Sequence, residues 1–289
     1  MNTFRIGGDL PVHPLGFGAM QLTDWGPSKD PSAAIAVVRR AVELGVTLID
    51  TADAYGLGAN EELLAQALHP YPRGLVIATK AGQSRPGRGR WVPLGRPEYL
   101  VQQAELSLLR LRLERIELFQ LHRVDPQVPF ADQIGALKRL RDEGKVRHIG
   151  LSEVGVAQIE EARRIVPIAG VQNRYNLTDR RHEDVLGHCE AAGIAFIPWE
   201  PVAGGAHAAT DGPLAEVARE VGGTPAQVAL SWLLARSPVM LPIPGTGSVA
   251  HLEENMAATR VELNGEQVAR LDAVWQGTRR EVRPDPGGA

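Results

Sequence analysis

Hydrophobic residues along the chain fall into short continuous runs that alternate with longer segments of helical periodicity. Short apolar runs bounded by glycine, proline or charged residues are typical of strands that are buried on both faces. Eight such runs are expected to be strands, at 15–19, 47–50, 75–80, 116–122, 146–152, 168–173, 194–199 and 239–243.

The segments between these runs have apolar residues three and four positions apart, which is the spacing of one helix face. Six helices are expected, at 30–45, 96–112, 130–144, 156–166, 181–193 and 225–237. Strands that alternate with helices pair in parallel through crossover connections. An open doubly wound sheet alternates in the same way, but eight units spread evenly over the chain favour a closed α/β barrel, the (β/α)8 TIM barrel.

Two further elements lie outside the eight units. Residues 4–13 read as an N-terminal β-hairpin with Gly-Gly-Asp near its turn. Residues 264–276 read as an extra C-terminal helix capped by Asn264. No linker interrupts the pattern, so we expect one domain over 1–289, with a disordered tail at 280–289.

Composition narrows the class of protein. The chain has 289 residues, 44% of them hydrophobic, and a net charge of -3. It has no basic stripe, so we expect no nucleic-acid partner. Its apolar runs are too short to cross a bilayer, and its start does not resemble a signal peptide. Cys189 is the only cysteine, which fits a reducing, cytoplasmic compartment. We expect a monomer or weak homo-oligomer.

Polar side chains stand at the ends of the predicted strands, where a barrel builds its active site. Asp50 ends the second strand, Lys80 the third and His122 the fourth. Taken singly, Asp50 and Lys80 make a structural ion pair and His122 a core histidine. Three ionisable groups on consecutive strands, with Tyr55 just beyond one of them, favour a reactive site instead.

These four groups suit proton transfer. A tyrosine phenol has a pKa near 10 and is a reluctant acid at neutral pH. We expect Lys80, held in its charged form by Asp50, to lower the pKa of Tyr55. Tyr55 would then protonate an oxygen that becomes an alkoxide, and His122 would orient that oxygen by a hydrogen bond. Hydride transfer from a nicotinamide creates such an oxygen. We expect no metal ion in this site.

The chain lacks the glycine-rich fingerprint by which Rossmann domains bind dinucleotides. The stretch GFGAMQ at 16–21 lacks the third glycine and does not run into a helix, so a Rossmann domain is the weaker interpretation. The segment 242–258 has a glycine-rich turn, and Ser248 there can cap a following helix. Exposed backbone N–H groups at such a helix start favour a phosphate, although a plain capped helix explains the pattern equally well.

Several motifs together resemble the aldo-keto reductase superfamily along nearly the whole chain. They are LIDTADAYG (48–56), VIATK (76–80), IELFQLHRVDP (116–126), GKVRHIGLSE (144–153), VQNRYN (171–176) and IPGTGSVAHLEEN (243–255). The resemblance implies a TIM barrel and NAD(P)H-dependent reduction of an aldehyde or ketone. It also implies a catalytic group of Asp50, Tyr55, Lys80 and His122, with Tyr55 as the general acid.

The resemblance also implies positions for the cofactor. Ser152 and Gln172 would bind the nicotinamide carboxamide, and Trp199 would stack on its ring. The remaining positions that the resemblance assigns to the cofactor are Pro201, Gly245, Thr246, Ser248, His251, Glu254 and Asn255.

Two features depart from the family pattern. Glu153 stands where the family usually has Asn, and Gly245 and His251 stand where its best-known branch has Lys and Arg to bind the 2′-phosphate. The resemblance implies NADP(H) as the preferred cofactor, and the missing cations leave NAD(H) as an alternative.

Within the superfamily, the stretches GFGAMQLTDWG, HPYPRGLVIATKAG and FIPWEPVAGG resemble the bacterial general oxidoreductases that are similar to pyridoxal reductases. The substrate would be a small aromatic aldehyde. Trp25 and Trp91 are candidate walls of its pocket, although each can equally well pin its own loop.

Two other functions remain open. One is a nucleotide-binding regulatory subunit on the same barrel with little turnover. The other is an aldolase or isomerase that uses Lys80 as a Schiff-base amine, against which Asp50 argues.

Overall fold

A parallel seven-stranded sheet forms the centre of the molecule. The computed structural model describes residues 4–203 and 212–278. In spatial order the strands are β11 (Ala195–Phe196), β10 (Ile168–Gln172), β9 (Val146–Ser152), β8 (Ile116–Leu121), β5 (Val76–Ala81), β4 (Leu48–Asp50) and β3 (Phe17–Gly18). Every neighbouring pair is parallel. Seven of the eight predicted runs therefore supply strands of one sheet, in chain order.

The eighth predicted run, 239–243, closes the sheet without forming a regular strand. On one side it makes a parallel bridge between Met240 and Phe196, and on the other side Gly245 bridges Gly18. Backbone N–H groups of Gly16 and Gly18 also donate to Pro242 and Pro244. The prolines remove N–H donors from this segment, which limits regular ladder pairing. Both edges of the sheet are nevertheless joined, and the sheet curls into a barrel.

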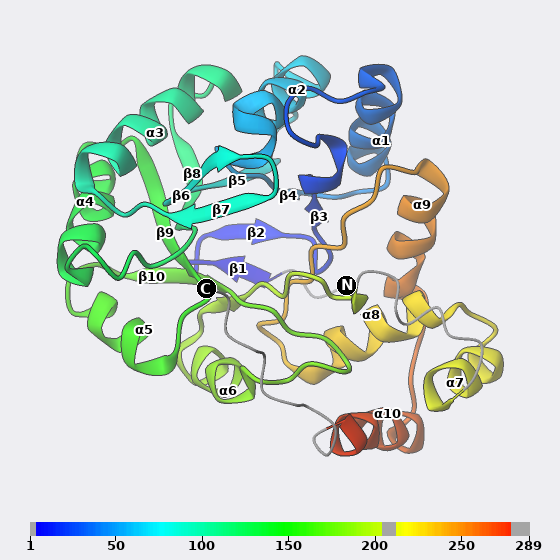
Figure 1. The fold of residues 1–289 in the computed structure, drawn as a ribbon. Helices are drawn as coiled ribbons and strands as arrows, with labels where there is room; N and C mark the ends of the chain where they lie inside the picture. The colour runs from blue at the N-terminus through cyan, green and yellow to red at the C-terminus, as the bar shows by residue number, and fades with distance from the viewer. Residues whose placement is uncertain (1–3, 204–211, 279–289) are drawn as a thin grey trace.

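Helices surround this barrel (Figure 1). They are α1 (Pro31–Glu43), α2 (Ala59–Leu68), α3 (Pro97–Leu111), α4 (Phe130–Asp142), α5 (Val156–Arg163), α6 (Glu183–Ala192), α7 (Pro213–Val221), α8 (Pro225–Arg236), α9 (Val249–Ala257) and α10 (Gly265–Thr278). The sequence does not predict α2 or α7. Seven of the ten residues of α2 are buried, so its apolar period is blurred, and α7 begins in a Gly- and Ala-rich stretch.

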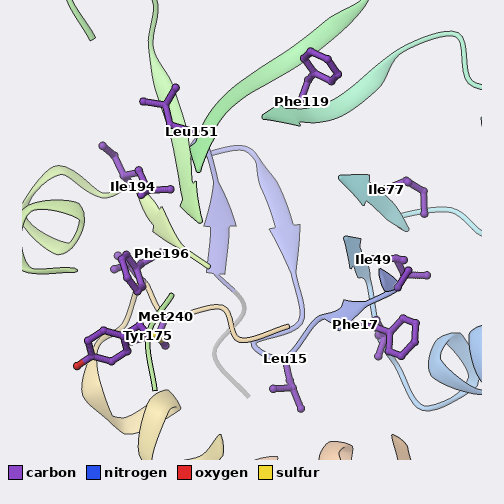
Figure 2. Packing of buried hydrophobic residues seen from close by; sticks show 14 of the residues in the cluster. Leu15, Phe17, Ile49, Ile77, Phe119, Leu151, Tyr175, Ile194, Phe196 and Met240 are labelled. Carbon is purple, nitrogen blue, oxygen red and sulfur yellow. The ribbon is translucent and has the colours of Figure 1, made fainter. Parts of the chain in front are cut away.

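The two predicted extras are present. Strands β1 (Phe4–Ile6) and β2 (Leu10–Val12) form the N-terminal antiparallel hairpin. Its side chains join an inner cluster with residues of the barrel interior, including Leu48 and Leu118. Figure 2 shows the hairpin within the ring of strands, while labelled residues such as Phe119 and Ile77 point outwards to the helices. At the other terminus, Asn264 caps α10 by accepting from the backbone N–H of Gln267 at 2.9 Å. The predicted tail at 280–289 lies outside the described residues.

A second hairpin, which the sequence does not predict, follows β5. Its strands are β6 (Gln83–Gly87) and β7 (Arg90–Pro93). The guanidinium of Arg85 lies 5.1 Å from the ring centroid of Trp25 and 3.7 Å from that of Trp91. These cation–π contacts join the hairpin to the loop after β3. Among the described residues, no helix is long and apolar enough to span a membrane.

Candidate active site

Lys80 is the centre of a buried cluster at the carboxyl ends of the strands. Its ammonium Nζ lies 2.5 Å from Asp50 Oδ2, donates to the carbonyl oxygen of Thr51 at 2.7 Å, and lies 3.4 Å from the hydroxyl of Tyr55. The side chains of Lys80 and Asp50 are 0% and 3% exposed. Because β4 and β5 are parallel neighbours, their ends place these two charges side by side.

Tyr55 reaches the cluster through a tightly held turn. It opens a short 3-10 helix, Tyr55–Gly58, just after the end of β4. Gly56 there has φ 58°, and a Cβ at this position would lie 2.7 Å from the carbonyl oxygen of Gly26. Only glycine fits such a close approach with a left-handed backbone. Asn60 holds the same turn by bonds to Thr51 Oγ1 and to the Ala19 carbonyl.

The second oxygen of Asp50 is also bonded. Asp50 Oδ1 accepts from Gln120 Nε2 at 3.1 Å and from Gln172 Nε2 at 2.8 Å. Gln120 is not among the predicted site residues, although it stands two residues before His122 and so points to the same side of the chain. The carboxylate is therefore fixed by an ammonium and two amides, a satisfied buried arrangement.

His122 follows β8 and faces Tyr55. The two ring centroids are 5.8 Å apart in an edge-to-face arrangement, and the ring of Trp91 is 6.3 Å from each. Burial lowers the pKa of His122 well below its usual value of 6.5, and the charges of Lys80 and Arg123 lower it further. The imidazole is therefore neutral at pH 7 and able to donate a hydrogen bond from one ring nitrogen.

Two opposing effects set the pKa of Tyr55. Burial raises the pKa of Tyr55 above its ordinary value of 10, and this outweighs the opposing effect of Lys80. Lys80 thus acts in the expected direction, but its effect on the pKa of Tyr55 is smaller than that of burial. Burial also disfavours the charge on Lys80, but Asp50 and Tyr55 outweigh it and raise the pKa of the ammonium. Tyr55 is thus protonated and Lys80 charged at neutral pH.

A cavity of about 320 Å³ opens beside these groups. Its walls include Tyr55, His122 and Trp91, of which Trp91 comes from the unpredicted hairpin. Trp25, the other candidate wall, does not line this cavity and instead contacts Arg85. A residue without any sequence prediction, Arg123, also lines it.

Five of the predicted cofactor residues lie around the same cavity. They are Ser152, Gln172, Trp199, Pro201 and Gly245. Ser152 ends β9 and Gln172 ends β10, so both side chains stand at the same barrel mouth as the cluster of Asp50. The hydroxyl of Ser152 accepts from Arg123 at 3.0 Å and keeps its own proton for a further acceptor.

Glu153, the departure from the family's Asn, turns towards Trp199. It adopts φ 55°. Its Oε1 accepts from the indole Nε1 of Trp199 at 2.7 Å and from the backbone N–H of Arg174 at 2.6 Å. Burial alone would raise the pKa of Glu153, but hydrogen bonds from His182, Trp199 and Arg174 lower it to about 2. The carboxylate therefore fixes the orientation of the indole.

The remaining predicted cofactor residues lie along the start of α9. Thr246 Oγ1 accepts from the backbone N–H of Ser248, and Ser248 caps α9 by accepting from that of His251. His251 is exposed and Asn255 is buried. The carboxylate of Glu254 instead accepts from Thr224 Oγ1 at 2.5 Å, at the start of α8. These five residues therefore do not line the cavity; they follow Gly245 in the segment that leads into α9 and in α9 itself.

A profile of the Aldo/keto reductase family matches residues 14–276, nearly the whole described barrel. The chain belongs to this family. It is 48% identical over 273 residues to an uncharacterized oxidoreductase of Schizosaccharomyces pombe, covering 93% of this chain and 89% of the relative. It is 40% identical over 282 residues to pyridoxine 4-dehydrogenase of Escherichia coli, covering 94% and 98%.

A solved aldo-keto reductase from Klebsiella pneumoniae in complex with NADPH has the same fold. Its TM-score is 0.83 at 27% identity, with 98% of this chain and 98% of that chain covered. The predicted membership of the aldo-keto reductase superfamily, in the branch of the bacterial oxidoreductases, is confirmed. The likeness also supports the predicted α/β barrel.

The chemistry of the residues around the cavity fits a nicotinamide nucleotide. Ser152 and Gln172 offer the donors and acceptors that a carboxamide needs, and Trp199 offers a planar face held in place by Glu153. At the far side, the approach of Gly245 to Gly18 is so close that a Cβ would lie 2.7 Å from the Gly18 carbonyl oxygen. Gly245 is therefore required by the barrel closure and cannot supply the cation of the best-known branch.

Proposed function

We propose that this protein reduces an aldehyde or ketone to an alcohol, with NADP(H) as the hydride source and Tyr55 as the general acid. One observation carries the proposal: the hydroxyl of Tyr55 lies 3.4 Å from the ammonium of Lys80, which is paired with Asp50, at the wall of an open cavity. A structural ion pair needs neither a phenol nor a cavity.

The proton roles follow from the charge states. Tyr55 is protonated at neutral pH and so can give its proton to the oxygen of the substrate carbonyl as negative charge develops there. Lys80 stabilises the phenolate that remains, and Asp50 keeps Lys80 charged. The neutral His122 donates a hydrogen bond to the same oxygen and orients the carbonyl.

The cofactor would lie against Ser152, Gln172 and Trp199, with Pro201 and Gly245 beside it. Bound there, NADPH would supply the hydride for the carbonyl carbon of the substrate. The NADPH complex of the Klebsiella relative supports this choice of cofactor. Thr246, Ser248, His251, Glu254 and Asn255 would bind the adenosine half. Since Gly245 and His251 bring no permanent cation, NAD(H) remains an alternative to the preferred NADP(H).

A small aromatic aldehyde is the substrate class that we propose. The Escherichia coli relative is named pyridoxine 4-dehydrogenase, which supports an aromatic ring beside the reacting carbon. In this chain Trp91 presents an indole to the cavity next to Tyr55 and His122. An aromatic ring packs well in such surroundings, edge-to-face or stacked.

The test is consumption of NADPH with a panel of aldehydes, for the wild type and for Tyr55→Phe. Phenylalanine keeps the ring but cannot donate a proton, so kcat should fall about 100- to 10,000-fold. The Kd for NADPH, measured by calorimetry, should change little. Normal turnover in Tyr55→Phe would show that the acid is another group.

NADPH consumption and borohydride trapping separate the two alternative functions. A nucleotide-binding regulatory subunit would bind NADPH and consume almost none with any aldehyde. A Schiff-base enzyme would give a borohydride-trapped adduct on Lys80, which the paired and charged state of Lys80 argues against.

A further inference from the structure

Three charged side chains line the cavity in the described part of the chain: Asp50, Arg123 and Glu200. Both carboxylates have a partner, because Asp50 is paired with Lys80 at 2.5 Å and Glu200 with Arg174 at 2.8 Å. Arg123 has no carboxylate within salt-bridge distance among the described residues. The carboxylate of Glu153 acts on Arg123 only at longer range. A partly buried cation therefore lines the cavity without a direct ion-pair partner, which is a costly arrangement.

Arg123 lies beside the reacting groups. One nitrogen, Nη1, donates to the carbonyl oxygen of His122 at 2.6 Å and to Ser152 Oγ at 3.0 Å. These two bonds fix the guanidinium plane and leave its other N–H groups without a described acceptor. Burial lowers the pKa of Arg123, while the carboxylate of Glu153 and the phenol of Tyr55 raise it. The guanidinium is therefore close enough to act on Tyr55 itself.

The other cavity walls could hold an uncharged ring, but they supply no negative charge to balance Arg123. Trp91 and Trp199 are aromatic, and Met20 and Val202 are apolar. A substrate that places an anionic group near Arg123 would complete the charge balance of the cavity. A carboxylate matches the planar fork of a guanidinium, because both present two parallel hydrogen-bonding positions.

We propose that Arg123 binds a carboxylate on the carbonyl substrate, so that this reductase prefers aldehydes or ketones that carry an acidic group. The inference rests on the reductase function proposed above and names its substrate class. Arg123 acts as a specificity-determining residue: it pairs with the carboxylate while Tyr55 and His122 hold the carbonyl oxygen at the same end of the cavity.

The experiment compares carboxybenzaldehydes with their methyl esters. We would measure kcat/KM for meta- and para-carboxybenzaldehyde and for each ester, in the wild type, Arg123→Leu and Arg123→Lys. The ratio of acid to ester should fall about 10- to 100-fold in Arg123→Leu, as expected for losing a charged hydrogen bond. Arg123→Lys should recover part of the ratio, because it keeps the charge without the fork.

Arg174→Leu is the matched control. Arg174 also lies against the ring of Trp199, at 5.5 Å compared with 6.0 Å for Arg123, but it is already paired and does not line the cavity. Because this change alone would leave Glu200 unpaired at the cavity wall, it is made together with Glu200→Gln, and the double variant should leave the acid-to-ester ratio within about twofold.

The outcomes are distinct from those of the reductase test. If the wild type reduces no aldehyde, the proposed function itself is wrong. If it reduces aldehydes but Arg123→Leu changes acid and ester equally, Arg123 does not recognise the substrate's charge and the inference is overturned. If Arg123→Leu instead weakens NADPH binding in calorimetry and leaves the ratio unchanged, the guanidinium serves the cofactor, which also overturns it.

Discussion

Strand β5 separates two buried ion pairs that look alike but differ in surroundings. Lys80 points into the barrel and pairs with Asp50, with side chains 0% and 3% exposed. One residue earlier, Thr79 points outwards and donates to Glu61 on α2. Glu61 in turn pairs with Arg110 on α3, and the side chains of Glu61 and Arg110 are 0% and 17% exposed. Adjacent residues of a strand face opposite sides, so one strand serves both pairs.

The difference lies in what completes each pair. The carboxylate of Glu61 accepts from Thr79 at 2.6 Å and from Arg110 at 2.7 Å, and these bonds join β5, α2 and α3. The inner pair adds a phenol, a neutral imidazole and a cavity. Burial and pairing are common to both and therefore do not identify a reactive site. The open cavity and the phenol beside it are what distinguish the inner pair and support the proposed reaction there.

Removing the cation from each pair should separate stability from turnover. Lys80→Met and Arg110→Met each leave a buried carboxylate without its cation, which costs about 3–5 kcal/mol in the free energy of unfolding. Lys80→Met should also lower kcat about 100-fold or more, because Tyr55 loses its partner. Arg110→Met should keep kcat within a few fold. Denaturant unfolding and NADPH consumption measure the two quantities.

The comparison fails if both variants lose turnover equally at temperatures where both are folded. Arg110 packs against Gly58, at the end of the turn that carries Tyr55, so a loss through that turn is the competing explanation. Arg110→Lys controls for it, since lysine restores the cation to Glu61 with a different shape.

Asp53 lies near Glu61 and Arg110 and gives a pH-dependent effect. Its carboxyl is bonded by Tyr99 at 3.4 Å, and its Oδ1 is buried with no partner among the described residues. Burial, with the charge of Glu61, raises the pKa of Asp53 to about 8, and Arg110 opposes the shift. Asp53 therefore stays protonated in the folded state at neutral pH.

The raised pKa sets the sign of the pH dependence. The unfolded chain releases the proton of Asp53 above its ordinary pKa of 3.8, whereas the folded chain holds it to about pH 8. This contribution to stability is present below about pH 4 and is lost as the pH rises to about 8. Asp53→Asn removes the titration, so its free energy of unfolding should gain about 1.4 kcal/mol per pH unit relative to the wild type over that range. A constant difference at pH 4, 6 and 8 in urea unfolding would contradict the raised pKa.

Much of the barrel follows from local sequence. Buried strands such as 168–172 are apolar up to their last residue, and helices such as 130–142 have a clear apolar face, so their order predicts the parallel sheet. Elements held by polar contacts are not visible in that pattern. The hairpin β6–β7 is only partly buried, and it is held by Arg85 between two tryptophans, one of them in a loop far away in sequence.

The site shows the same division. Asp50, Lys80 and His122 could be predicted to meet because strand ends converge, and the motif placed Tyr55 beside them. The same rule could have predicted Gln120, because it points to the same side of the chain as His122, two residues later. The direction of the pKa shift of Tyr55 could not be predicted, because it depends on how far the effect of burial outweighs that of Lys80. The role of Glu153 could not be predicted from the sequence either, because its positive φ turns the side chain to Trp199.

Glu153 offers the smallest test, at the rim rather than within the buried pairs. Glu153→Ala removes the acceptor of the Trp199 indole N–H, so the ring loses its fixed orientation and the Kd for NADPH should rise about fivefold, near 1 kcal/mol. Glu153→Gln keeps an oxygen acceptor and should change the Kd less than about twofold. In a Trp199→Phe background, which has no N–H to bond, Glu153→Ala should have no further effect on the Kd. If both backgrounds lose the same affinity, Glu153 acts on the nucleotide through its charge and not through the indole.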